Sequence, residues 1–282
     1  LIQMKTFEKK LFKLIEISVK KRLQNISNPV LLFSGGIDST FLAILSKKFN
    51  QNIRLVTVKN NFFRGELYYV KLFEKLTNYK VHKINVFDFY KIKIINKFIR
   101  NLDQPLSVPS YLFLCFFINI IKKNSKIVLT GDGADEVFYG YEKFKNIWDN
   151  SSNSNLDKSS FLNLKHNFSL NDYGKQIYDL GLGGHGYIKI DKSFSENQIE
   201  CRAPFLDFDL VDFVRKIPVT YWKDSLGNKS FLKKYLLNIG FSYEYIYRKK
   251  KGIIFPFKIF LLVNYFYILI FNLICRKKFG SK

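Results

Sequence analysis

Residues 30–40 have the sequence VLLFSGGIDST, in which a short apolar run leads directly into two glycines and then into hydroxyl and carboxyl side chains. The apolar run, Val30 to Phe33, is too short for a helix and does not alternate with polar residues, which predicts a strand buried on both faces. A helical pattern follows from Phe41 to Phe49. Glycines between a strand and a helix N-terminus leave backbone N–H groups open to a ligand, so this stretch predicts a cradle of pyrophosphate size.

The carboxylate of Asp38 lies inside this predicted anion cradle. A negative side chain fits beside phosphate when a cation lies between the two, and Mg²⁺ is bound by one or two carboxylates together with phosphate oxygens. The alternative is a tight strand-to-helix turn in which an aspartate or serine only caps the helix.

Strand and helix patterns alternate as far as Thr130. Right-handed βαβ crossovers are therefore expected, and with them a parallel sheet flanked by helices, whose ligands bind at the carboxyl ends of the strands. Beyond Tyr141 the alternation stops, which predicts a more helical C-terminal half. We expect a nucleotide-binding α/β core over residues 1–145 and a mostly helical part over residues 146–282 that completes the site. The expected further strands are 53–58, about 80–87 and 126–130, and the expected helices are about 3–24, 65–77, 88–100, 110–122, 205–216 and 228–238.

A second polar block, TGDGADE at residues 130–136, follows the predicted strand 126–130 and should open on the same edge of the sheet. Its acids Asp132, Asp135 and Glu136 repel one another, which a divalent cation or a proton-transfer task would explain. The alternative is a solvated acidic turn.

Two further blocks carry charged residues among glycine, proline and apolar positions. The third block is ECRAPFLD at residues 200–207. The fourth comprises Lys229, Leu232 and Lys233, followed by RKKKG at 248–252 and by Pro256. The glycine-rich stretch 181–186 is not preceded by a strand pattern, so a plain loop is expected there.

The four blocks, in this order, resemble the synthetase domain of the asparagine synthetase family, the N-type ATP pyrophosphatases, from the first helix to about Phe260. Their counterparts in the family are the motifs SGGxDS, LSGEGxDExFxGY, ExRxPFLD, KxxLR and RxKxGFxxP. This resemblance implies an adenine nucleotide alpha hydrolase-like fold. It also implies a ligase that adenylates a carboxylate with Mg-ATP, releases pyrophosphate and transfers ammonia to give an amide and AMP.

The resemblance also implies roles for individual residues. Pyrophosphate would be held by Ser34, Gly35, Gly36, Ser39 and Thr40. The adenylate would be framed by Leu32, Val58, Thr130 and Gly131, and Mg²⁺ would be bound by Asp38 and Asp135. The implied catalytic residues are Lys250, which would neutralise phosphate charge, Asp132, which would handle the amine, Glu136 and Glu200.

Two departures from the family pattern concern the substrates. The resemblance implies a small carboxylic acid substrate, aspartate or a related acid. The stretch 103–111 contains no basic residue, where asparagine-forming members usually place an arginine, and this departure counts against aspartate itself. No cysteine precedes Cys115, so we expect nitrogen from free ammonia or from a separate glutaminase subunit.

The amino-acid composition narrows the classes of protein to which the chain can belong. The net charge of +23 comes mainly from lysine, with only eight arginines, which argues against specific nucleic-acid recognition. Three cysteines and three histidines give no disulfide framework and no zinc spacing, and a cytoplasmic location is expected. The alternatives to the ligase are a tRNA-modifying or other ATP pyrophosphatase and a decayed, non-catalytic binding protein.

Residues 259–275 contain no charged side chain and are followed by Arg276, Lys277 and Lys278. Two asparagines interrupt this run, and as a helix it is short for a bilayer, so a buried closing helix is expected. The alternative is weak membrane association through residues 259–278.

Overall fold

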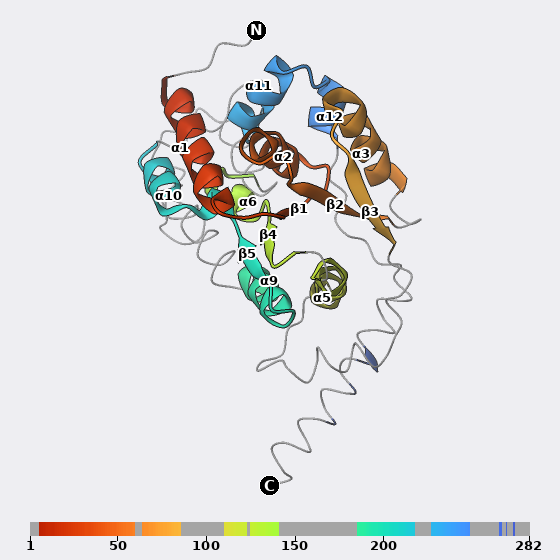
Figure 1. Cartoon of the computed structure of the whole chain (residues 1–282). Coiled ribbons are helices and arrows are strands. Elements are labelled where there is room, and N and C mark those ends of the chain that lie inside the picture. The colour runs from red at the N-terminus through yellow and green to blue at the C-terminus, as the bar shows by residue number, and fades with distance from the viewer. Residues whose placement is uncertain are drawn as a thin grey trace, which may run out of the picture.

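The computed structural model describes residues 6–59, 64–85, 110–122, 125–140, 185–217 and 227–248, together with Tyr265, Phe266, Leu269 and Leu273. The described strands form a five-stranded sheet in the order β3-β2-β1-β4-β5, in which every neighbouring pair is parallel (Figure 1). The predicted parallel sheet flanked by helices is confirmed. The strands are β1 (Val30–Leu32), β2 (Arg54–Lys59), β3 (Val81–Asn85), β4 (Ile127–Leu129) and β5 (Glu200–Arg202).

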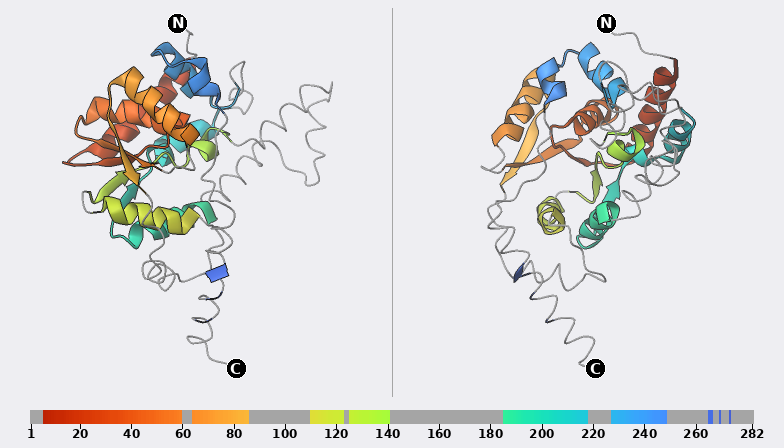
Figure 2. Two further views of the ribbon diagram at one scale, coloured as in Figure 1. Left: turned by 90° about the vertical axis from the view of Figure 1, so that its right-hand side faces the viewer. Right: turned by 180° about the vertical axis from the view of Figure 1, so that it is seen from behind.

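Helices cover both faces of this sheet. Helices α5 and α9 lie on one face, and α1, α2, α3, α10, α11 and α12 lie on the other (Figures 1 and 2). The helices are α1 (Thr6–Leu23), α2 (Ile37–Phe49), α3 (Arg64–Thr77), α5 (Ser110–Ile121), α6 (Ala134–Val137), α9 (His185–Ser195), α10 (Phe208–Arg215), α11 (Ser230–Asn238) and α12 (Tyr243–Tyr247), with a 3-10 turn at η4 (Pro204–Leu206).

The side chains of β1 alternate between two hydrophobic clusters. Val30 belongs to a cluster with α5 and α9, whereas Leu31 and the following Phe33 belong to a larger cluster with α1, α2 and α11. Val30 and Leu31 are fully buried. The prediction that this strand is buried on both faces is therefore confirmed, and the first loop leaves the sheet between two packed layers.

Strand β5 was not predicted from the sequence. Its three residues, Glu-Cys-Arg, have neither an apolar run nor a strand-like alternation of apolar residues. The strand is defined by its partner: Leu129 of β4 pairs with Arg202, and the Thr130 N–H donates to the Arg202 carbonyl at 3.0 Å. This pairing places the third sequence block beside the second at the edge of the sheet.

Other predictions need correction. The single helix expected at 205–216 is instead η4 followed by α10, because Pro204 begins a separate 3-10 turn. The loop expected at 181–186 ends earlier, since His185 and Gly186 belong to α9. The helix expected at about 88–100 lies outside the described residues.

The closing segment at 259–275 is described at four positions, all helical. The side chains of Tyr265 and Leu273 are 65% and 60% exposed, and those of Phe266 and Leu269 are also exposed. The expected buried closing helix is therefore wrong at these positions. Within the described part of the chain, no helix has both the length and the apolar character needed to cross a bilayer.

Gly133 joins the second block to the third. Its φ angle is +87°, and a Cβ atom built on it would lie 2.2 Å from Cδ2 of Leu206. We expect Gly133→Ala to lower the free energy of unfolding by about 3 kcal/mol, through backbone strain and overpacking together. The matched control is Gly240→Ala, where φ is +98° but no heavy atom lies within 4 Å, and where about 1 kcal/mol of strain alone is expected.

Urea unfolding of both variants measures this difference. In addition, Gly133→Ala and Leu206→Ala should be non-additive, with a double-variant loss at least about 1 kcal/mol smaller than the sum. Equal losses at Gly133 and Gly240 would contradict this packing.

Candidate active site

The first loop folds back on itself through its two serines. The Ser34 N–H donates to Ser39 Oγ at 3.2 Å, the two hydroxyls lie 3.0 Å apart, and Ser39 Oγ donates to the Gly36 carbonyl at 3.1 Å. Gly35 has a φ angle of +72°, a conformation that favours glycine. Helix α2 begins after Gly36, and no side chain caps it. The alternative in which an aspartate or serine caps this helix is therefore wrong, and the geometry matches an anion cradle.

Thr40 is placed differently from Ser34 and Gly36. It is fully buried, and its hydroxyl lies 2.7 Å from the hydroxyl of Tyr245 on α12. In this structure the Thr40 side chain joins α2 to α12 and is not presented at the loop. Tyr245 is far from Thr40 in the sequence, so the local motif carried no signal of this contact.

Arg248 also lies at this loop, although the sequence assigned no role to it. Its guanidinium lies 4.3 Å from the ring centroid of Tyr69, a cation–π contact. A Cβ atom built on Gly35 would lie 3.7 Å from Nη2 of Arg248. A cation thus borders the predicted pyrophosphate cradle. Membership in the fourth sequence block was the only signal that marked this arginine.

Lys229 connects the first, second and fourth blocks. Its Nζ donates to Asp38 Oδ1 and Oδ2 at 2.7 and 2.8 Å and lies 2.6 Å from Asp135 Oδ1. The side chain of Lys229 is only 8% exposed. Asp38 follows β1 and Asp135 follows β4, so the ammonium joins the carboxyl ends of two neighbouring strands.

The backbone around Lys229 is built for this close contact. Lys229 has a φ angle of +56° and directly precedes α11. Gly140 packs against it: a Cβ atom there would lie 2.1 Å from Lys229 Cε and 2.2 Å from Asp135 Oδ1. Only a residue without a side chain leaves room for the lysine at this position.

Burial disfavours the charged form of Lys229, but the carboxylates of Asp38 and Asp135 outweigh it, so the pKa of this ammonium is raised. The lysine therefore stays protonated at neutral pH and neutralises part of the acidic pair.

The two carboxylates fit a divalent cation. Both reach one positively charged atom, and Mg²⁺ in nucleotide sites takes one or two carboxylates and completes its shell with phosphate oxygens and water. Among the described residues, no group of three or more potential metal-ligating side chains occurs. Asp38 and Asp135 are thus the residues that would hold Mg²⁺ with a nucleotide.

The other predicted residues surround this centre. Gly131 lies against Asp38, since a Cβ atom there would be 3.5 Å from Asp38 Cβ. Leu32 and Val58 are partly buried on the side of the sheet covered by α5 and α9. Glu136 is partly exposed on α6. Lys250 lies outside the described residues.

Asp132, Glu200 and the buried Thr130 line a cavity of about 820 Å³ beside β5. Cys201 also lines it, 3.7 Å from the hydroxyl of Thr130. Burial, followed by the charges of Asp132, Asp191 and Glu200, raises the pKa of the Cys201 thiol to about 12. A thiolate is therefore disfavoured at this position.

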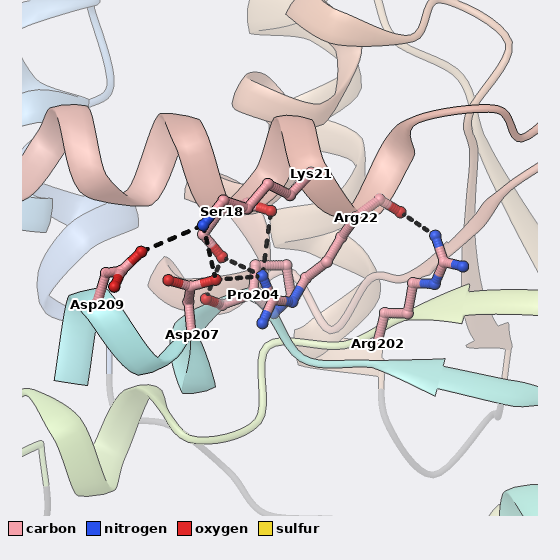
Figure 3. Close-up of polar contacts among 7 residues, drawn as sticks. All are labelled: Ser18, Lys21, Arg22, Arg202, Pro204, Asp207 and Asp209. Carbon is pink, nitrogen blue, oxygen red and sulfur yellow. Dashed lines mark hydrogen bonds and ion pairs between the residues drawn. The ribbon is translucent and has the colours of Figure 1, made fainter. Parts of the chain in front are cut away.

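A polar network fastens helix α1 to the third block (Figure 3). Arg22 Nη1 donates to Asp207 Oδ2 and to Ser18 Oγ, both at 2.8 Å, and Ser18 Oγ donates to the Pro204 carbonyl at 2.6 Å. Arg202 Nη1 donates to the Arg22 carbonyl at 2.7 Å. The network fixes the turn that carries Leu206 against Gly133.

Comparison with known proteins identifies the family of the chain. The family model described as Asparagine synthase matches residues 10–179 and 183–265. The chain belongs to the asparagine synthase family.

Two curated relatives show the range of similarity. The chain is 25% identical over 217 residues to a putative glutamine-hydrolyzing asparagine synthetase of Methanocaldococcus jannaschii, covering 76% of this chain and 37% of that protein. It is 24% identical over 272 residues to an asparagine synthetase domain-containing protein of Drosophila melanogaster, covering 83% and 46%. The chain therefore spans less than half the length of either relative.

Solved structures are more distant. An NH3-dependent NAD synthetase from Campylobacter jejuni matches with a TM-score of 0.35 and 14% identity, covering 89% of this chain and all of that chain. The U34-tRNA thiolase NcsA from Methanococcus maripaludis matches with a TM-score of 0.37 and 13% identity, covering 94% and 80%.

Replacing Lys229 by methionine should be strongly destabilising. Lys229→Met leaves Asp38 and Asp135 close together without their shared cation, and removing one partner of a buried ionic group costs about 3–5 kcal/mol. The control is Lys216→Met, which removes an exposed pair with Asp212 and should cost less than about 0.5 kcal/mol. Urea unfolding reports both losses.

A second variant separates charge from packing. Adding Asp38→Asn to Lys229→Met removes the remaining repulsion and should restore part of the lost stability. Two results together would show that the three charged groups do not depend on one another. The added Asp38→Asn would restore no stability, and Lys229→Met alone would lose no more stability than Lys216→Met.

Proposed function

We propose that this protein is an ATP-dependent, amide-forming ligase that adenylates a substrate carboxylate, releases pyrophosphate and passes the acyl group to ammonia. The observation that carries the proposal is the convergence of Asp38 and Asp135 on one cation beside the uncapped N-terminus of α2. Such an arrangement suits a polyphosphate bound together with a divalent cation. Membership in the asparagine synthase family supports ATP as the nucleotide and amide formation as the reaction.

The groups around the Asp38–Asp135 centre would have separate roles in the proposed reaction. The loop from Ser34 to Ser39 would hold the β- and γ-phosphates through backbone N–H groups and hydroxyls. Leu32 and Val58 would border the adenine on the face covered by α5 and α9. Mg²⁺ bound by Asp38 and Asp135 would neutralise phosphate charge, and Lys250 would add a positive charge as pyrophosphate leaves.

Lys229 has to serve both states of the centre. In the structure its ammonium group neutralises the two aspartates. If Asp38 and Asp135 held Mg²⁺, the flexible four-carbon stem of Lys229 would let its ammonium group contact phosphate oxygens instead. Asp132, which lines the cavity beside β5, would accept a proton from the attacking nitrogen. Aspartate and related carboxylic acids are the proposed substrates.

Adenylation should depend on both aspartates. We expect Asp38→Asn and Asp135→Asn each to lower ATP–pyrophosphate exchange by about 100-fold or more, since each removes one anchor of the phosphate-bound cation. Exchange is measured across a panel of carboxylic acids that includes aspartate and uronic acids. Asp212→Asn, an equal charge change on the exposed face of α10, is the control and should keep full exchange.

Circular dichroism at the assay temperature shows whether each variant is folded. Full exchange in folded Asp38→Asn and Asp135→Asn would contradict the proposed centre. Folded wild-type protein without exchange on any acid would instead favour a non-catalytic binding protein.

The nitrogen should come from ammonia without glutamine hydrolysis by the described cysteines. Burial raises the pKa of the Cys115 thiol to about 12, and Cys201 is in the same condition, so neither supplies a thiolate near neutral pH. We expect no glutamate from glutamine in the pure protein. Amide formation should become faster as pH rises toward the ammonium pKa, because only neutral ammonia attacks the adenylate. Glutamate release that is lost in Cys115→Ser or Cys201→Ser would refute this.

A further inference from the structure

Helix α2 begins at the first loop and, through Thr40, makes a buried contact with α12. The Thr40 N–H donates to the Gly36 carbonyl at 2.9 Å, so Thr40 belongs to the first turn of α2. Its hydroxyl lies 2.7 Å from the hydroxyl of Tyr245, and both residues are fully buried. A hydroxyl enclosed in this way does not face a phosphate oxygen. The contact instead fixes α12 against the start of α2.

Tyr245 also contacts the helix that borders the first loop. Helix α12 lies beside α3 (Figures 1 and 2), and the ring centroids of Tyr245 and Tyr69 are 5.9 Å apart, with an interplanar angle of 78°. The next residue of α3, Val70, lies against the loop, since a Cβ atom built on Gly35 would be 3.6 Å from Val70 Cγ2. The first loop, α3 and α12 therefore pack together as one unit.

Arg248 directly follows α12 and brings a positive charge to this unit. Its guanidinium lies 4.3 Å from the ring centroid of Tyr69. Cβ atoms built on Gly35 and Gly36 would lie 3.7 and 3.9 Å from Nη2 of Arg248. A guanidinium carries several N–H donors in a fixed geometry that matches phosphate oxygens. An anion bound at the first loop would therefore lie within reach of this arginine.

We propose that Arg248 binds the pyrophosphate part of the nucleotide at the first loop, and that Thr40 positions this arginine through Tyr245 and Tyr69 instead of binding phosphate itself. The inference rests on the proposed function and deepens it, because it names a further ligand of the phosphates and the residues that support this ligand. Thr40 would then have a different role from the one that the sequence resemblance implies.

The contacts to Tyr69 and Tyr245 lower the entropy that Arg248 loses when an anion binds. A long side chain that already lies against a ring is ordered before binding, so less conformational freedom is lost on binding. Loss of the hydrogen bond between Thr40 and Tyr245 would release α12 and the arginine that follows it. Affinity for pyrophosphate should then fall, although every group that contacts the phosphates is still present.

The role of Arg248 is tested by isothermal titration of the full chain with inorganic pyrophosphate in the presence of Mg²⁺. Arg248→Met should weaken pyrophosphate binding at least about tenfold, because charge-assisted hydrogen bonds are lost. The matched control is Lys10→Met, which removes a cation 4.8 Å from the ring centroid of Phe213 and should leave the affinity unchanged. Equal affinities of Arg248→Met and the wild-type protein, or no pyrophosphate binding by the wild-type protein, would overturn the proposal.

Two hydroxyl deletions separate positioning from direct binding. Thr40→Val and Tyr245→Phe each remove one partner of the same hydrogen bond, so each should weaken pyrophosphate about three- to tenfold. The double variant should bind no more weakly than the weaker single variant. Thr40→Ser keeps the hydroxyl and should recover most of the affinity lost in Thr40→Val. The control is Tyr243→Phe, which removes a hydroxyl from an exposed tyrosine of the same helix and should bind like the wild-type protein.

A loss of affinity in Thr40→Val without a loss in Tyr245→Phe would make Thr40 a phosphate ligand and overturn the positioning role. Circular dichroism at the titration temperature shows whether each variant is folded. If Thr40→Val does not fold, Tyr245→Phe decides alone, and wild-type affinity in that variant would overturn the positioning role.

Pyrophosphate exchange separates this inference from the proposed function. With an accepted acid, Arg248→Met and Tyr245→Phe should raise the KM for pyrophosphate and leave the KM for the acid unchanged, which a general loss of folded protein would not do. Exchange with the same KM for pyrophosphate in Arg248→Met and the wild-type protein would overturn the inference and leave the ligase intact. Pyrophosphate binding that depends on Arg248 and Tyr245, in a protein that shows no exchange on any acid, would support the inference and overturn the ligase.

Discussion

The ammonium group of Lys229 is the point on which the architecture of the site depends. It contacts carboxylate oxygens of Asp38 and Asp135 at 2.6–2.8 Å, so one buried charge holds together the loops after β1 and β4 and the start of α11. The glycine at position 140 leaves the space for it. Without this cation, two carboxylates at the carboxyl edge of the sheet would repel each other in a partly desolvated place, and the loops would separate.

The parallel sheet and its first loop could be predicted because their signals are local. A four-residue apolar run followed by two glycines defines β1 and the turn after it, wherever the rest of the chain lies. Strand β5 has no such signal: Glu200 and Arg202 are charged, and the strand exists because its backbone pairs with β4. The four described helical positions Tyr265, Phe266, Leu269 and Leu273 are exposed and show the same limit, since an apolar run does not say which surface covers it.

The site residues divide in the same way, into those that the sequence could predict and those that depend on packing. That Asp38 and Asp135 would face the same edge follows from the rule for parallel strands, and the structure places both on one ammonium. The burial of Thr40 against Tyr245 and the approach of Arg248 to Gly35 depend on how α12 packs, which no motif encodes. The polar network between α1 and the third block likewise joins residues far apart in the chain, and it supports the wall of the cavity beside β5.

The location of the nucleotide is the central claim, and paramagnetic broadening by Mn²⁺-ATP measures it directly. In amide NMR spectra of the full chain, the account predicts that signals of Gly36, Asp38 and Asp135 vanish first as Mn²⁺-ATP is added. Signals of α10, such as Asp209 and Asp212, should stay sharp, and Mg²⁺-ATP should restore the lost peaks. Broadening centred on another surface, or spread evenly over the lysine-rich exterior, would contradict the account.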